Sequence, residues 1–328
     1  MFKFIHYFIF WIGFQFYKIT KWTFSYSNYS FRKLFVLTKG KINDDLSGSI
    51  IKKVGTYKLQ SQSGVLGNLS KSDLDRIVSV INKDGYYIFD NKLKDDVISV
   101  LTNYALTFEA ELIPHPPDGR RRAKYERKNL ISPRYQFDEA VLTENKLVQE
   151  LLTDCSLLAV AQEYLGVKPI QDLTAMWWST TFSKEASSEA AQLYHFDMDR
   201  IKFIKFFFYL TDVTSETGPH CYIRGTHMHM PEKLWKDERI LDSEIDQEIK
   251  KENWIEIVGN KGSIIAVDTR WLHKGKPLID GERLILQFEF ANSLFGAPYQ
   301  KIDIKNKIDS KALHILKAYS YTFQRFKY

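Results

Sequence analysis

Two side chains of metal-binding type stand one residue apart in the middle of the chain. His195 and Asp197 are separated by Phe196. Side chains at positions i and i+2 of an extended strand point to the same face, so both could reach one ion. A pair of this kind is common by chance. Its meaning depends on whether a second histidine and an anion-binding residue occur elsewhere in the chain.

Both of these residues occur later. His273 follows the strand-like run SIIAVDT, and Arg283 opens the strand-like run RLILQF after an Asp-Gly turn. We expect a hairpin to bring Arg283 back beside His273. Two imidazoles and one carboxylate on one face of an octahedral ion leave three positions open, as in non-haem Fe(II) oxygenases. A bidentate 2-oxo acid and O₂ can fill these positions, and the Arg283 guanidinium can pair with the far carboxylate of the acid.

The elements expected to hold these residues are strands. From Ala175 onward, short apolar runs alternate with turns rich in Gly, Pro, Asn and Asp, which predicts an antiparallel sandwich or jelly roll. The expected strands are MWWSTTF, KFFFYLTDV, CYIRGT, WIEIV, SIIAVDT and RLILQFEFANS, with one helical insertion at residues 237–253. On the second strand, Lys205 shares a face with Tyr209. It therefore either faces the cosubstrate or extends its ammonium group to solvent at the sheet edge.

Helices are expected before and after the strands. Ser70 to Asp73 forms a capping box that begins a helix through about Lys83, and Gly85 ends it before a strand at residues 86–89. Apolar residues at helical spacing predict further helices at residues 95–112, 145–165 and 310–319.

A basic loop separates two of these helices, at residues 116–134. Two interpretations remain open: a solvated surface loop, or a lid that docks an anionic substrate. Its basic residues are Arg120, Arg121, Arg122, Lys124, Arg127, Lys128 and Arg134. Of the histidines outside the candidate site, His220 and His227 are assigned no catalytic role, and His229 is expected to be exposed.

Composition narrows the class of protein. The chain has 328 residues, 44% hydrophobic and 26% charged, with a net charge of +6, and it lacks the long basic stripe expected for nucleic-acid binding. Its two cysteines, Cys155 and Cys221, form no disulfide framework, which favours a reducing compartment such as the cytoplasm.

The N-terminal third is less clearly patterned. Residues 1–19 are almost entirely apolar, which indicates either contact with a membrane surface or a helix packed on the domain. We predict an apolar and basic segment at residues 1–39, a linker at 40–69, a catalytic domain at 70–300 and a helical tail at 301–328. The sequence leaves the oligomeric state undetermined.

Several motifs together resemble the phytanoyl-CoA dioxygenase-like family of Fe(II)/2-oxoglutarate-dependent oxygenases. The resemblance covers roughly residues 70–295, and Arg224 departs from the proline that many relatives have. The motifs are His195-x-Asp197, Tyr209 to Val213, Gly218-Pro219-His220, Gly225-Thr226-His227, His273 and Arg283, with GYYIFDN and LLAVAQEYLG nearer the N-terminus.

The resemblance implies an α+β fold, with a double-stranded β-helix (jelly roll or cupin-like) core and flanking N-terminal helices. It implies Fe(II) held by His195, Asp197 and His273, with 2-oxoglutarate on Arg283 and O₂ as the second cosubstrate. The implied function is hydroxylation of a small or lipid-like molecule, with release of succinate and CO₂. The alternatives are a non-catalytic jelly-roll binding protein that retains a metal site and a cupin-type zinc enzyme.

Overall fold

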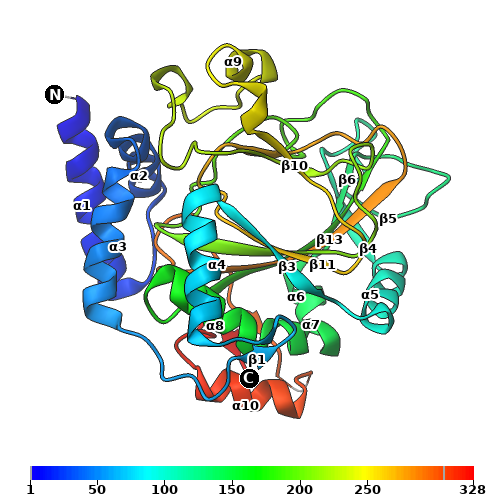
Figure 1. Cartoon of the computed structure of the whole chain (residues 1–328), viewed down its shortest axis with the longest axis horizontal. Helices are drawn as coiled ribbons and strands as arrows, with labels where there is room; N and C mark the ends of the chain where they lie inside the picture. Colours follow the sequence, from blue (N-terminus) through cyan, green and yellow to red (C-terminus); the bar gives the residue numbers. More distant parts are fainter. Residues whose placement is uncertain (1, 306) are drawn as a thin grey trace.

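The computed structural model describes residues 2–305 and 307–328, and its core is a pair of antiparallel sheets (Figure 1). The larger sheet has eight strands in the order β3-β11-β8-β13-β7-β6-β4-β5, and the smaller has the order β10-β9-β12. An apolar cluster that includes Trp177, Phe207 and Ile257 joins the two sheets. This is the expected α+β jelly roll with flanking helices.

The strands of the large sheet are β3 (Tyr86–Lys92), β4 (Glu109–Ile113), β5 (Arg122–Lys124), β6 (Arg134–Gln136), β7 (Ile170–Thr180), β8 (Phe203–Tyr209), β11 (Ser263–Val267) and β13 (Glu282–Ala291). Those of the small sheet are β9 (His220–Ile223), β10 (Trp254–Ile257) and β12 (His273–Gly275). Two short pairs lie outside them: β1 (Ser63–Gly64) with β2 (Gly67–Asn68), and β14 (Ile302–Asp303) with β15 (Phe326–Lys327).

The helices before the strands are α1 (Phe2–Thr20), α2 (Ser25–Thr38), α3 (Lys41–Val54), α4 (Lys71–Asp84), α5 (Asp95–Thr107), α6 (Glu139–Thr143), α7 (Lys146–Leu152) and α8 (Cys155–Leu165). Later in the chain come α9 (Asp242–Asp246), α10 (Ser310–Ala318) and the 3₁₀ turns η1 (Glu232–Leu234) and η2 (Lys251–Asn253).

Strand β8 shows how the sequence positions the site. Phe206 and Phe208 pack in the main hydrophobic core with α4 and α8, whereas Phe207 and Tyr209 belong to the cluster between the sheets. Because strand side chains alternate between faces, Lys205 shares the inner face with Phe207 and Tyr209. A strand buried on both faces needs this continuous apolar run, so the one charged residue within it stands out.

Most of the predicted elements are confirmed in position. The capping box of Ser70 and Asp73 begins α4, Gly85 ends it with φ +86°, and α10 lies where the tail helix was expected. Strands β7 to β11 and β13 cover the predicted runs.

Three predicted helix boundaries are wrong. The helix expected at 95–112 ends at Thr107, because the chain turns into edge strand β4. The helix expected at 145–165 divides at Asp154, whose carboxylate accepts hydrogen bonds from the backbone amides of Ser156 and Leu157 and so caps a new helix. Within residues 237–253, only the short α9 and η2 are helical.

Residues 40–69 are also more ordered than their Gly/Ser-rich pattern predicts, since residues 41–54 form α3. Asn43 is buried, and its amide donates to the carbonyl of Ile201 at 2.7 Å. Ser47 accepts a hydrogen bond from Asn292 at 3.0 Å. These long-range contacts stabilise a helix that local sequence patterning alone does not indicate.

Phe295 attaches the N-terminal helices to the jelly roll. Its ring is fully buried and makes edge-to-face contacts with Phe10, Phe14, Tyr17 and Phe31, at centroid distances of 5.1 to 5.6 Å. The helix-on-domain interpretation of residues 1–19 is therefore correct for one face of α1. No helix in the described part of the chain is long and apolar enough to cross a membrane.

We expect Phe295→Ala to lower the free energy of unfolding by about 3–5 kcal/mol, because it opens a cavity among four aromatic rings. Urea denaturation followed by circular dichroism measures this loss. Phe182→Ala is the control, since Phe182 is 51% exposed. A loss below about 1 kcal/mol for Phe295→Ala would mean that α1 and α2 are not firmly packed on the domain.

Candidate metal and 2-oxo-acid site

The two histidines of the site meet through their backbones, although they are far apart in sequence. His195 and His273 form an isolated antiparallel bridge in which each amide donates to the carbonyl of the other, at 3.0 and 2.9 Å. The amide of Asp197 donates to the carbonyl of Thr269 at 2.8 Å. The segment 195–197 is therefore held along the chain that leads into β12.

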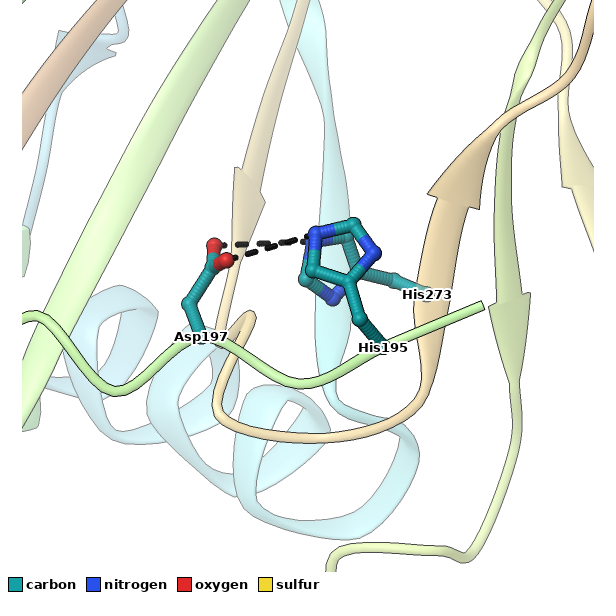
Figure 2. Close-up of side chains that lie close together, drawn as sticks. All are labelled: His195, Asp197 and His273. Atoms are coloured by element: carbon teal, nitrogen blue, oxygen red, sulfur yellow. Dashed lines mark ion pairs between the residues drawn. The ribbon is translucent and has the colours of Figure 1, made fainter. Parts of the chain in front are cut away.

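This pairing brings three candidate ligands together. Nε2 of His195 lies 3.4 Å from Asp197 Oδ1, and Nε2 of His273 lies 3.5 Å from Asp197 Oδ2. One donor atom from each residue lies within 4.8 Å of the other two. Figure 2 shows the carboxylate facing both imidazoles, which come from separate stretches of backbone. Two nitrogens and one oxygen at this spacing can hold one divalent ion, with its remaining positions open.

Backbone carbonyls orient both imidazoles. Nδ1 of His195 donates to the carbonyl of Leu193 at 2.8 Å, and Nδ1 of His273 donates to that of Trp271 at 2.9 Å. With the proton on Nδ1, the lone pair of Nε2 points toward Asp197, which is the tautomer a metal ligand needs. Burial lowers the pKa of His273 to about 3, so its imidazole is neutral at physiological pH.

Lys205 is the neighbour of the candidate carboxylate ligand. Its ammonium donates to Asp197 Oδ2 at 2.6 Å and lies 3.4 Å from Glu289 Oε2. Burial alone would raise the pKa of Asp197, but the adjacent Lys205 ammonium outweighs it and holds that pKa well below its usual range. Lys205 is buried, so the expectation that it reaches solvent at the sheet edge is wrong.

Arg283 enters the same cavity from the opposite sheet. Only 5% of its surface is exposed, and its Nη2 donates to Ser179 Oγ at 3.1 Å. Its Nε and Nη1 have no hydrogen-bond partner among the described residues. Burial lowers the pKa of Arg283. A buried guanidinium with unpaired donors is costly, and a bound carboxylate would compensate for this cost.

The route by which Arg283 reaches the site differs from the predicted hairpin. Strand β12 pairs with β9 in the small sheet, whereas β13 pairs with β7 and β8 in the large one. Arg283 and His273 are thus brought together by the packing of two sheets. Gly275 leaves room for this approach, because a Cβ there would lie 3.3 Å from Arg283 Nη2.

The candidate ligands and Arg283 line one cavity of about 190 Å³. Trp177 and Phe207 form part of its apolar wall, and Lys205, Gln136 and Gln287 contribute polar groups. The cavity can therefore hold a small dianion beside a metal ion. The two imidazoles and the carboxylate fit the metal ion, and the Arg283 guanidinium fits the dianion.

Two cavity residues were not recognised from the sequence. Arg134 belongs to the basic loop by sequence, but on β6 it lies over the Trp177 ring at 4.3 Å and lines the cavity. Burial and the nearby Arg283 lower the pKa of Arg134 to about 10. His220 also lines the cavity, with its ring 5.3 Å from that of His273 and its Nε2 unpartnered among the described residues. The alternation of side chains along a strand could have assigned Arg134 and His220 to the cavity only if the neighbouring strands in each sheet had been known.

The other residues of the basic loop lie at the surface. Arg120 pairs with Asp118, Arg122 with Asp138, and Arg127 with Glu282. His229 is exposed, as expected, and His227 bonds the carbonyl of Asn82 away from the candidate site.

The sequence model of the phytanoyl-CoA dioxygenase (PhyH) family matches residues 81–279, which is more than half of the chain. The chain therefore belongs to this family of Fe(II)/2-oxoglutarate-dependent oxygenases, as its motifs indicated. All three candidate ligands lie inside the matched range, whereas Arg283 lies just beyond it. No curated protein matches the chain.

Three solved structures have a similar arrangement. The alpha-ketoglutarate-dependent epimerase SnoN of nogalamycin biosynthesis has 17% identity and a TM-score of 0.49, covering 68% of this chain and 84% of that one. HygX from Streptomyces hygroscopicus, solved with nickel and 2-oxoglutarate, has 14% identity and a TM-score of 0.48, covering 68% and 87%. EctD from S. alaskensis, solved with bound Fe, has 15% identity and a TM-score of 0.47, covering 72% and 79%. Since all three scores are below 0.5, the assignment rests on the family match.

Proposed function

We propose that this protein is a 2-oxoglutarate-dependent dioxygenase that hydroxylates a small molecule and releases succinate and CO₂. One observation carries the proposal: a buried, partly unpaired Arg283 lines the same small cavity as two imidazoles and a carboxylate within 4.8 Å of one another. Ferrous iron and 2-oxoglutarate, when bound, would supply the oxidising chemistry. The chain itself supplies binding, orientation and the exclusion of water.

Each residue then has a defined task. His195, Asp197 and His273 would hold the iron, with the two imidazoles oriented by the carbonyls that accept from their Nδ1 atoms. Lys205 keeps Asp197 ionised and fixes its rotamer through the bond to Oδ2, and a contact of Lys205 with the cosubstrate stays a proposal. Arg283 would bind the far carboxylate of 2-oxoglutarate. Because Asp197 takes the third protein position, hydroxylation is favoured over halogenation, which needs that position for a halide.

The test is succinate release from the purified chain with Fe(II), ascorbate, 2-oxoglutarate and a broad set of candidate substrates. Substrate-stimulated succinate release would support the proposal. The two alternatives, a non-catalytic binding protein and a zinc enzyme, need no buried arginine beside the metal. Protein that binds metal but shows no thermal stabilisation by 2-oxoglutarate, and no succinate with any substrate, would favour them.

We further propose that the substrate is anionic and that Arg134 contacts it. Arg134→Gln is expected to raise the apparent KM for the true substrate by about 10-fold or more, because Arg134 is the second guanidinium of the cavity. Arg120→Gln is the matched control, since Arg120 is exposed and paired with Asp118. An unchanged KM for Arg134→Gln, or an equal rise for Arg120→Gln, would contradict the assignment.

We also propose that residues 70–300 act as the catalytic domain, within a reducing compartment such as the cytoplasm. Both cysteines are free thiols, and Cys221 is buried, which suits such a compartment.

A further inference from the structure

The outward face of α1 carries large apolar side chains that the fold does not cover. The exposed fractions are 79% for Phe4, 64% for Phe8, 59% for Trp11 and 84% for Ile19. These positions recur at spacings of three to eight residues and fall on one side of the helix. Ile5, Tyr7 and Ile12 border this stripe and are also exposed, at 48%, 37% and 45%. Figure 1 shows α1 at the outer edge of the molecule.

The opposite face of α1 accounts for its attachment to the protein. His6, Phe10, Gly13 and Tyr17 are buried at helical spacing, and Phe10 and Tyr17 pack against Phe295. The exposed stripe therefore adds nothing to the core. A contiguous apolar surface of this kind is unusual on a globular domain and marks a place where another surface binds.

Further exposed aromatic side chains follow α1 in the chain. Trp22 in the connecting turn is 58% exposed, and Tyr26 and Tyr29 at the start of α2 are 78% and 51% exposed. Trp and Tyr are the side chains enriched at the boundary between lipid and water, because each joins an apolar ring to a polar group.

The charged side chains of the N-terminal segment itself have one sign. Residues 1–43 contain seven lysines and arginines and no aspartate or glutamate; the first acidic residue is Asp44. Lys3, Lys18 and Lys21 are exposed on or beside α1, and no salt bridge to any of them occurs among the described residues. Lysines without a salt bridge around an apolar stripe complement a surface that is apolar inside and negatively charged at its boundary.

We propose that α1 and the start of α2 dock on an anionic phospholipid surface, with α1 lying in the plane of the interface. The stripe would enter the boundary of the acyl chains, and Lys3, Lys18 and Lys21 would meet the headgroups. A spanning orientation is excluded while Phe10 and Tyr17 remain packed on the domain, because one face of α1 then never meets lipid. This inference is independent of the proposed iron chemistry.

Helix α2 also borders the candidate site. Arg32 of α2 is salt-bridged to Asp237, and both line an open hollow of about 350 Å³ that also includes His195 and Asp197. One helix of the pair proposed to bind lipid therefore borders one approach to the candidate ligands.

Vesicle sedimentation of the full-length protein tests the proposal. The probes are vesicles of phosphatidylcholine alone and of phosphatidylcholine mixed with phosphatidylserine. We expect binding to the mixed vesicles, weakened by added salt. The combined variant Phe4→Gln, Phe8→Gln and Trp11→Gln should lose at least about tenfold in partition coefficient. Glutamine is chosen because it preserves helix propensity.

The matched control replaces three other exposed apolar residues, which lie outside the patch, with glutamine: Phe182, Val258 and Ile279, at 51%, 47% and 67% exposure. It should bind as the unchanged protein does. A second variant, Lys3→Gln, Lys18→Gln and Lys21→Gln, should lose on the order of tenfold on the anionic vesicles only. Circular dichroism and thermal melting check that every variant is folded.

Three results would overturn the proposal. One is the absence of vesicle binding by the unchanged protein. Another is an equal loss of binding in the control variant. The third is self-association of the unchanged protein in analytical ultracentrifugation, without lipid binding, that the Phe4, Phe8 and Trp11 substitutions abolish. In that case the patch would be an interface between copies of the chain.

Discussion

His195→Ala is expected to lower the affinity for a divalent metal by more than about 100-fold and to abolish succinate release. Loss of a directly bound imidazole should exceed the roughly 10–100-fold effect typical of an outer partner. The remaining pair, Asp197 and His273, still has its lone pairs directed to one point, but two donors bind an ion weakly. Titration calorimetry with Mn²⁺ on the metal-free protein measures the affinity without depending on turnover.

His229→Ala is the matched control for this experiment, because His229 is an exposed histidine outside the cavity. Its metal affinity and succinate release should equal those of the unchanged protein. Metal-free His195→Ala should melt as a folded protein, since the backbone bridge to His273 does not involve the imidazole. Metal affinity of His195→Ala within a few-fold of the unchanged protein would place the ion elsewhere.

Arg283→Gln is expected to weaken 2-oxoglutarate binding on the order of 100-fold or more, while leaving metal affinity nearly unchanged. Removing one partner of a buried charge pair costs about 2–5 kcal/mol, and every 1.4 kcal/mol is tenfold in affinity. The thermal stabilisation by 2-oxoglutarate in the presence of Mn²⁺ should disappear. The melting temperature of the ligand-free protein should stay the same or rise, because the substitution removes a buried cation with unpaired donors.

The melting temperature of the ligand-free Arg283→Gln variant distinguishes a binding role of Arg283 from a structural one. A structural Arg283 would lower the ligand-free melting temperature when replaced, by losing its bond to Ser179. Arg127→Gln is the control, since Arg127 is an exposed arginine that pairs with Glu282 near the start of the same strand. Unaltered 2-oxoglutarate binding in Arg283→Gln would refute the assignment of this residue.

The chemistry of the candidate site was accessible from residue types and local spacing. The i, i+2 pair of His195 and Asp197, the later His273 and the arginine at a strand start indicate a metal and 2-oxo-acid site, and the structure places all four on one cavity. Most strands from Ala175 onward were equally predictable, because a short apolar run bounded by turn residues is a local property of the chain. Strands β4, β5 and β6 were not predicted, and β5 lies inside the expected basic loop.

The manner in which these residues meet depended on tertiary structure. His195 and His273 are 78 residues apart and are joined by a backbone bridge outside the named strands, and Arg283 arrives from the other sheet. Arg134 and His220 became site residues only through the strand pairing that turns them inward. Helix α3 forms where its composition predicts a linker, because Asn43 and Ser47 find partners far along the chain.

The sequence by itself determined which side chains could bind an ion and an acid, because ligand type and strand period reside in neighbouring residues. The tertiary structure decided which of the many polar and basic side chains share a buried cavity, and which face of α1 is left uncovered. These features depend on desolvation and on contacts between distant segments, and no local pattern specifies either of them.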